Sequence, residues 1–358
     1  MSTLLVLGTL PAPWQRTITA AAGASALQQA VVEDPAAFAT FPAVAAIVLG
    51  GPGADAGVAS ETLLTGEALR KDERLERVAI FAAAARPTTS DYVAALTSGI
   101  DDLLTDPSDV TGVALRFRAA REAAAGSPPS LRRGLAWAIG SKTVRSAARA
   151  RALRAAGFRA MEGPGDTGAP WLAEPRLALV VWETRDPELA LAEVRRARTA
   201  GTLCRFVLCV PEAVATAVAL ECEKLDGVRA IPETAPPDSV VFLVNQMAEF
   251  SLHNQRATRR RLASTLVTFR GADRSDLGLS YNVSAGGLYV RTLAPPQSGR
   301  VELSVEVGAA QPAQVVGEVA WSRALSHDGT ATAPPGFGVK IVEASDVARA
   351  ALAALGAG

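Results

Sequence analysis

The segment Arg256-Ala-Thr-Arg-Arg-Arg261 places four arginines within six residues, at the end of a predicted helix. A guanidinium carries several N–H donors in one plane, and these donors match the paired oxygens of a phosphate or a carboxylate. Because the four charges are close together, the segment is expected to attract an anion. A run of arginines is also common at the solvated end of a helix, so the segment alone does not identify a ligand.

A second stretch, Asn282-Val-Ser-Ala-Gly-Gly287, places an amide, a hydroxyl and two glycines between two short apolar segments at 266–269 and 288–292. This composition predicts a turn between strands. Asn282 and Ser284 offer small polar side chains that can hydrogen-bond to a ligand. The glycines leave bare backbone that a ligand can approach closely.

The order and separation of these groups resemble the PilZ domain family. The resemblance begins at Arg256 and Arg260 and continues through Phe269-Arg270, the 282–287 stretch, Gly287-Leu-Tyr-Val-Arg-Thr292, Gly317-Glu-Val-Ala-Trp321 and Gly336-Phe-Gly-Val-Lys-Ile341. It implies a six-stranded antiparallel β-barrel over residues 255–347, with a C-terminal helix at 345–355, that binds the second messenger cyclic di-GMP. The implied ligand-binding residues are Arg256, Arg260, Arg261, Asn282, Ser284, Gly286 and Gly287. The second family arginine is either Arg260, which keeps the spacing, or Arg261.

The length of 358 residues suggests two or three domains. The 36 basic and 36 acidic residues cancel, so net charge gives no reason to expect a nucleic-acid partner. No segment has the roughly 18 consecutive apolar residues of a membrane-spanning helix. The N-terminus also lacks a basic leader, so we expect a cytoplasmic protein without membrane insertion. The three cysteines, Cys204, Cys209 and Cys222, lack metal-type spacing and are expected to be reduced core residues.

Residues 1–125 alternate short apolar strands with helices. Strands are expected at 4–7, 44–49, 78–81 and 102–105, and helices at 17–29, 61–71, 91–98 and through 118. This alternation predicts a doubly wound, flavodoxin-like α/β sheet. The phrase Gly99-Ile-Asp-Asp-Leu-Leu-Thr-Asp-Pro107 resembles the end of a response-regulator receiver. Receivers need clustered carboxylates for Mg²⁺ and a lysine, whereas the matching positions hold Gly8-Thr9, Gly50-Gly51 and Asp106. We therefore expect a degenerate receiver that cannot be phosphorylated.

The same alternation restarts after a linker, Gly126-Ser-Pro-Pro-Ser130, and covers residues 131–250. Strands are expected at 135–139, 177–181, 206–210 and 228–232, and helices at 142–156, 187–199, 212–225 and from 238. This segment resembles a second degenerate receiver. Glu183 is the single carboxylate near the phosphorylation position. It is either a fixed charge that mimics phosphorylation or a solvated loop residue.

The last helix of this segment, from Ser239, has no glycine or proline before Arg256 and could place the arginines at a domain junction. The combined prediction is a non-enzymatic effector without catalytic residues, cofactor or metal. Cyclic di-GMP binding would alter the docking of an unidentified protein partner on the receiver-like domains, in motility, pilus or surface behaviour. The alternative is a scaffold that does not bind the nucleotide, and a homodimer is left open.

Overall fold

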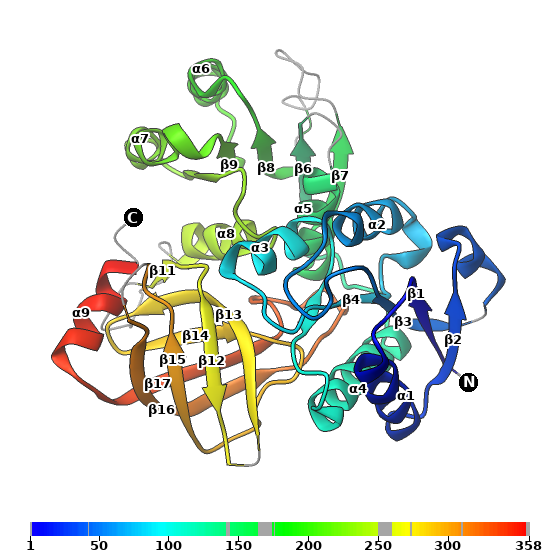
Figure 1. Ribbon diagram of the computed structural model, residues 1–358. Coiled ribbons are helices and arrows are strands. Elements are labelled where there is room, and N and C mark those ends of the chain that lie inside the picture. The colour runs from blue at the N-terminus through cyan, green and yellow to red at the C-terminus, as the bar shows by residue number, and fades with distance from the viewer. Residues whose placement is uncertain are drawn as a thin grey trace. The chain divides into compact units, whose positions relative to one another are not determined.

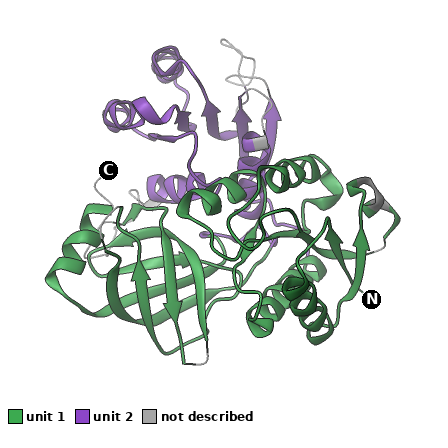
Figure 2. Ribbon diagram, in the orientation of Figure 1, with its two compact units in different colours: residues 1–126, 256–326, 334–358 green, residues 127–255, 327–333 purple. Residues whose placement is uncertain are grey.

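The computed structural model describes residues 2–41, 43–140, 144–163, 174, 176–249, 260–272, 274–308 and 311–355. Figure 1 shows three sheets along the chain. The chain divides into two compact units, which Figure 2 colours separately. The first unit comprises residues 1–126, 256–326 and 334–358, and the second comprises residues 127–255 and 327–333. The first parallel sheet and the C-terminal barrel therefore belong to one unit.

The first sheet is parallel, with the strand order β2-β1-β3-β4-β5. Apolar side chains cover both faces, with Trp14 and Phe117 on one side and Tyr92 on the other. Thr88 and Asp91 begin α3 with a reciprocal capping box. The elements are β1 (Thr3–Leu7), α1 (Ala12–Ala24), β2 (Gln28–Val32), β3 (Val44–Leu49), α2 (Ser60–Arg70), β4 (Ala79–Ala83), α3 (Thr89–Thr97), β5 (Asp102–Leu104) and α4 (Val110–Ala125), with 3-10 turns at Pro35–Thr40 and Glu73–Leu75.

The second sheet repeats this arrangement, with the order β10-β9-β8-β6-β7 and parallel pairing throughout. Its elements are β6 (Leu135–Ile139), α5 (Val144–Ala155), β7 (Arg159–Gly163), β8 (Leu177–Glu183), α6 (Pro187–Thr199), β9 (Arg205–Val210), α7 (Glu212–Glu223), β10 (Val228–Pro232) and α8 (Ser239–Glu249). Both sheets have the flavodoxin-like order in which the second strand lies at an edge. The predicted doubly wound class is confirmed, and the assignment to receivers remains a prediction.

Two strands of the parallel sheets were not predicted, β2 and β7. The expected helix at 17–29 was wrong at its end, because α1 stops at Ala24 and Gln28 already begins β2. Both missed strands are edge strands, and each has one neighbour only. Their sequences, Gln-Gln-Ala-Val-Val and Arg-Ala-Met-Glu-Gly, lack the apolar run that marks a central strand, because an edge strand is not buried on both faces.

The third sheet is antiparallel and closes on itself. Its ring runs β13-β12-β15-β16-β17-β14 and is closed by the pairing of β14 with β13, so the predicted six-stranded barrel is confirmed. A two-residue strand, β11, adds to β13 outside the ring. The elements are β11 (Arg261–Leu262), β12 (Leu266–Arg270), β13 (Ser275–Ser284), β14 (Gly287–Arg291), β15 (Arg300–Val305), β16 (Ala313–Arg323), β17 (Gly336–Ala344) and α9 (Asp346–Leu355).

The barrel packs on the first sheet within the first unit. Leu266 and Leu279 of the barrel lie in one apolar cluster of that sheet, and Leu293 lies in the other. The barrel also has an interior of its own, where Phe269 and Phe337 meet edge to face with ring centroids 4.9 Å apart. These three leucines therefore face away from the barrel interior and complete the core of the first sheet.

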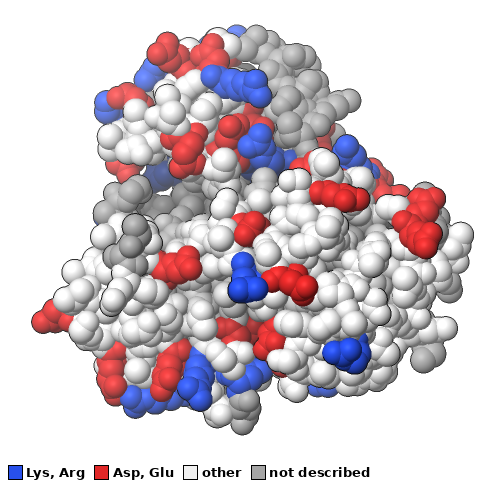
Figure 3. All heavy atoms as spheres, in the orientation of Figure 1, with Lys and Arg blue, Asp and Glu red and all other residues white. Residues whose placement is uncertain are grey.

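The three cysteines are free and buried in the second unit, as predicted. Burial raises the pKa of both Cys204 and Cys222 to about 11, because a thiolate loses its hydration there. No helix in the described part of the chain has the length and apolar character needed to span a bilayer. On the face in Figure 3, acidic and basic side chains are interspersed, so that face carries no extended field of one sign.

Candidate functional site

Two β-bulges turn side chains onto the outer wall of the barrel. In β13, Leu279 packs outside the barrel and Val283 packs inside it, although the two residues would share a face in a regular strand. The pairing with β14 shifts register between Ser280 and Asn282, which leaves Tyr281 as the extra residue. This bulge reverses the alternation, so Asn282 and Ser284 face outward.

A second bulge acts in the same way on β16. Val315 and Val319 pack into the barrel interior, so an uninterrupted strand would also bury Trp321 there. The register with β17 shifts between Val319 and Trp321, with Ala320 as the extra residue. Trp321 therefore emerges on the outer wall and is 39% exposed.

The two bulges place four residues in one row across four strands. Asn282 pairs with Tyr289, Tyr289 with Gly338, and Gly338 with Trp321. The rings of Tyr289 and Trp321 are tilted by 33° with centroids 4.9 Å apart. A Cβ at Gly338 would lie 2.6 Å from the indole Nε1 of Trp321, so the glycine makes room for this contact. The Tyr289 hydroxyl donates to the Pro334 carbonyl oxygen at 2.6 Å, which fixes the buried ring.

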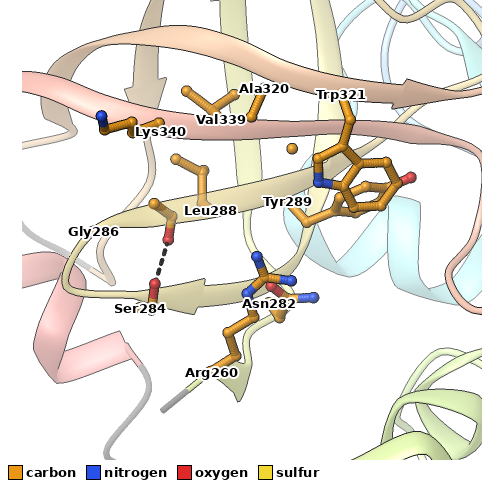
Figure 4. A pocket seen from close by; sticks show the side chains of 12 residues that line it. Arg260, Asn282, Ser284, Gly286, Leu288, Tyr289, Ala320, Trp321, Val339 and Lys340 are labelled. Carbon is orange, nitrogen blue, oxygen red and sulfur yellow. Dashed lines mark hydrogen bonds between the residues drawn. The ribbon is translucent and has the colours of Figure 1, made fainter. Parts of the chain in front are cut away.

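This row forms one wall of a hollow with a volume of about 270 Å³. The volume lies just below the range of about 300–1,000 Å³ typical of small-molecule sites. Figure 4 shows the Arg260 guanidinium turned toward Asn282 and the aromatic pair, with Lys340 at the opposite end from Trp321. The lining residues are Arg260, Asn282, Ser284, Gly286, Gly287, Leu288, Tyr289, Ala320, Trp321, Gly338, Val339 and Lys340.

The predicted turn is shorter than expected. Asn282 and Ser284 are the end of β13 rather than turn residues, and only Ala285 and Gly286 form the turn. The Ser284 hydroxyl donates to the Gly287 carbonyl oxygen at 3.2 Å and closes the hairpin. A Cβ at Gly287 would lie 2.2 Å from the Val339 carbonyl oxygen, whereas Gly286 has open space around it. Gly287 is thus required by close backbone approach, and Gly286 is not.

Five of the seven predicted site residues line the hollow: Arg260, Asn282, Ser284, Gly286 and Gly287. Arg261 does not line it, because it lies in β11 opposite Val283. Its placement at a helix end was wrong. Arg256 falls outside the described residues, as does the predicted continuation of α8 beyond Glu249.

The aromatic wall, formed by Tyr289 and Trp321, and Lys340 were not among the predicted site residues. The strand pairing that joins Tyr289, Gly338 and Trp321 follows from the antiparallel register of β14, β17 and β16. Only the two glycines of Gly336-Phe-Gly-Val-Lys-Ile341 could have signalled close packing on that strand. The chemistry of the hollow combines a guanidinium, an ammonium group, an amide and an exposed indole, which suits an anionic ligand with a flat ring.

In the first sheet, Gly8 and Gly50 lie at positions where a receiver would carry aspartates, and neither has room for a side chain. Gly8 adopts φ +79°, and a Cβ there would lie 2.8 Å from the Gly50 carbonyl oxygen. A Cβ at Gly50 would meet the Leu10 side chain at 2.8 Å. The carboxyl ends of β1 and β3 are therefore too close together to hold an aspartate.

The matching edge of the second sheet carries a buried ion pair. Arg149 donates from Nη1 to a Glu183 carboxylate oxygen at 2.5 Å and from Nη2 to the Glu233 carbonyl oxygen at 2.6 Å. The side chains of Arg149 and Glu183 are only 2% and 8% exposed. The interpretation of Glu183 as a solvated loop residue was wrong. The guanidinium also offsets the charge that would mimic a phosphoryl group.

Neither parallel sheet is expected to accept a phosphoryl group from acetyl phosphate and Mg²⁺, because no described residues gather three Asp, Glu, His or Cys side chains that could hold the metal. Intact-mass measurement after incubation should show the unmodified mass. A stoichiometric phosphate adduct that disappears in Asp55→Asn or Glu183→Gln would contradict this prediction.

A family model described as the PilZ domain matches residues 254–357. No curated protein sequence matches the chain. Among solved structures, the chain is similar to the Bacillus subtilis inhibitor of motility (18% identity, 28% of this chain and 49% of that one, TM-score 0.24). It is also similar to the PilZ domain of Escherichia coli YcgR, solved with c-di-GMP (13%, 28% and 86%, 0.23), and to Borreliella burgdorferi PlzA in complex with c-di-GMP (15%, 34% and 49%, 0.22). The chain spans about half the length of the Bacillus and Borreliella proteins.

Proposed function

We propose that this protein is a non-enzymatic receptor for cyclic di-GMP and that the nucleotide binds in the hollow beside β13, β14, β16 and β17. The observation that carries the proposal is the convergence of Arg260, Asn282 and Ser284 with the exposed Trp321 inside the segment that matches the PilZ model. Cyclic di-GMP presents phosphates and guanines, and arginine can pair with either group and stack on purine faces.

The geometry divides the hollow into two parts with different chemistry. The Trp321 indole, supported from behind by Tyr289, offers a flat apolar face at one end. The exposed Lys340 lies at the other end, opposite Gly287, which in turn pairs with Ser284. We infer that a guanine stacks toward Trp321 with Asn282 at its edge, and that a phosphate lies toward Ser284 and Lys340. Stacking on an aromatic side chain contributes about 1–3 kcal/mol per base.

The proposed consequence of binding is altered docking of a protein partner, and the process that we propose, from the resemblance to the PilZ family, is motility, pilus or surface behaviour. The α/β sheets supply large surfaces for such a partner. Their identity as degenerate receivers belongs to this proposal.

Tryptophan fluorescence offers a direct test of the ligand position. Trp14 and Trp182 are buried, whereas Trp321 is exposed in the hollow. Cyclic di-GMP should therefore change the emission of the wild-type protein, and Trp321→Phe should remove most of that change. Trp137→Phe is the matched control, because Trp137 lies on β6 in the other unit and its indole Nε1 makes no hydrogen bond. A change that survives in Trp321→Phe and is lost in Trp137→Phe would place the ligand elsewhere.

A further inference from the structure

The hairpin that carries the hollow is held at its other end by the first α/β sheet. Strand β13 begins near Asp276 and ends at the site residues Asn282 and Ser284. Strand β14 starts at Gly287 beside the hollow and leads to Thr292. Because the two strands are paired neighbours, the hairpin tip lies at the hollow and the hairpin base lies at the first sheet.

Arg116 of α4 is the centre of the contact at the hairpin base. Its Nε donates to an Asp102 carboxylate oxygen at 2.9 Å, and its Nη1 and Nη2 donate to the two Asp276 oxygens at 3.0 and 3.1 Å. Nη2 also lies 3.4 Å from the Thr292 hydroxyl. One guanidinium thus joins the first sheet to both legs of the hairpin. The side chains of Arg116, Asp102 and Asp276 are each no more than 3% exposed.

Asp102 completes the contact from the first sheet. Its carboxylate accepts the backbone N–H of Leu293, just after β14, at 2.9 Å. The hydroxyl of Tyr92, from α3, donates to its other oxygen. Arg274 adds a second cation by pairing with Asp276 at 2.5 Å. Two arginines therefore balance two aspartates in a largely buried site, where fixed geometry is needed to offset the cost of desolvation.

We propose that Arg116 is a positioning residue for the nucleotide site, and that nucleotide binding at the hairpin tip is transmitted to α3, β5 and α4 of the first sheet through the hairpin base. This inference rests on the proposed function for the identity of the ligand. The coupling must act in both directions: if the nucleotide stabilises the hairpin base, a loosened base must weaken nucleotide binding by the same factor.

Hydrogen exchange in the full-length protein without nucleotide tests the positioning role. Arg116→Lys keeps the charge but loses the two-pronged contact with Asp276, and Tyr92→Phe removes only the hydroxyl that contacts Asp102. Both variants should speed exchange of the backbone amides at 281–289. Glu343→Gln is the control, since it breaks the exposed barrel ion pair between Arg300 and Glu343. It should leave these amides unchanged.

Affinity for cyclic di-GMP tests the coupling at a temperature where every variant is folded. Couplings of this kind change affinity by about two- to thirtyfold, and we expect Arg116→Lys to fall in that range while Glu343→Gln does not. In a double-mutant cycle, Arg116→Lys and Asn282→Ala should be non-additive. In the wild type, added nucleotide should slow exchange in β5 and at 291–293.

Three results would overturn the proposal. The first is that Arg116→Lys and Tyr92→Phe both exchange the hairpin-tip amides at the wild-type rate. The second is that the effects of Arg116→Lys and Asn282→Ala on affinity are additive, and the third is that the protection caused by nucleotide stops at the tip. If cyclic di-GMP fails to bind the wild-type protein, the proposed function fails by itself. The comparison without nucleotide still decides whether Arg116 positions the hairpin.

Discussion

Replacing Arg260 by alanine will weaken the binding of cyclic di-GMP about ten- to hundredfold and leave the fold unchanged. The Arg260 side chain lines the hollow and faces Asn282, where it can donate charge-assisted hydrogen bonds to the ligand. A hydrogen bond to a charged group contributes about 1.5–3 kcal/mol, and each 1.4 kcal/mol corresponds to a factor of about ten in affinity. Calorimetric titration of both proteins measures the difference.

Arg261→Ala is the matched control, because it removes the same charge from the next residue. Arg261 is exposed on β11 and does not line the hollow, so we expect its loss to change affinity less than threefold, within about 0.6 kcal/mol. Equal losses in the two variants would mean that only the positive field of the segment matters. A larger loss in Arg261→Ala would make Arg261 the second family arginine.

Replacing Arg116 by methionine will lower the free energy of unfolding by about 3–5 kcal/mol, the usual cost of leaving buried charges without their partner. Here Asp102 and Asp276 would both lose the guanidinium. Chemical denaturation of the full-length protein measures this loss, and the transition to follow is the unfolding of the unit that contains the barrel. The comparison variant is Glu343→Gln, whose ion pair with Arg300 is about 60% exposed on both sides. It should cost less than about 1 kcal/mol.

Acid should weaken the same contact between Arg116 and Asp276 at the hairpin base. Burial tends to raise the pKa of Asp276, but Arg116 and Arg274 outweigh that effect and hold the pKa below its ordinary value. Since this pKa is depressed in the folded state, the stabilisation is present above the unfolded value of about 3.9 and is lost as pH falls through the folded one. The stability difference between wild type and Arg116→Met should therefore shrink at acidic pH. A difference that stays constant down to pH 2 would contradict the assigned ion pairs.

Much of the fold could be predicted, because buried parallel strands need continuous apolar runs such as Leu-Ala-Leu-Val-Val in β8. The barrel was predictable from a family pattern in its strands and turns. The strands β2 and β7 could not be found in this way, because an edge strand carries little of that apolar signal.

The site was predicted on one side only. Asn282, Ser284 and Arg260 belong to a recognisable spacing, whereas Trp321 follows Val315 and Val319 in an alternation that predicts a buried side chain. The alternation reverses at a bulge, and a bulge depends on how two strands pair rather than on either sequence alone. The contact at the hairpin base could not be predicted for a similar reason. Arg116 and Asp276 are 160 residues apart, and in the sequence each resembles an ordinary surface charge.

The most direct test of the central claim is a calorimetric titration of cyclic di-GMP into the full-length wild-type protein. The proposed site predicts saturable binding with a defined stoichiometry, and linear GTP at the same concentration should not displace the cyclic dinucleotide. A dissociation constant of about 1 mM corresponds to a binding free energy of only about −4 kcal/mol. If no saturable heat is seen at nucleotide concentrations up to that value, the receptor function is contradicted. Such a result would favour a scaffold that acts through protein contacts alone.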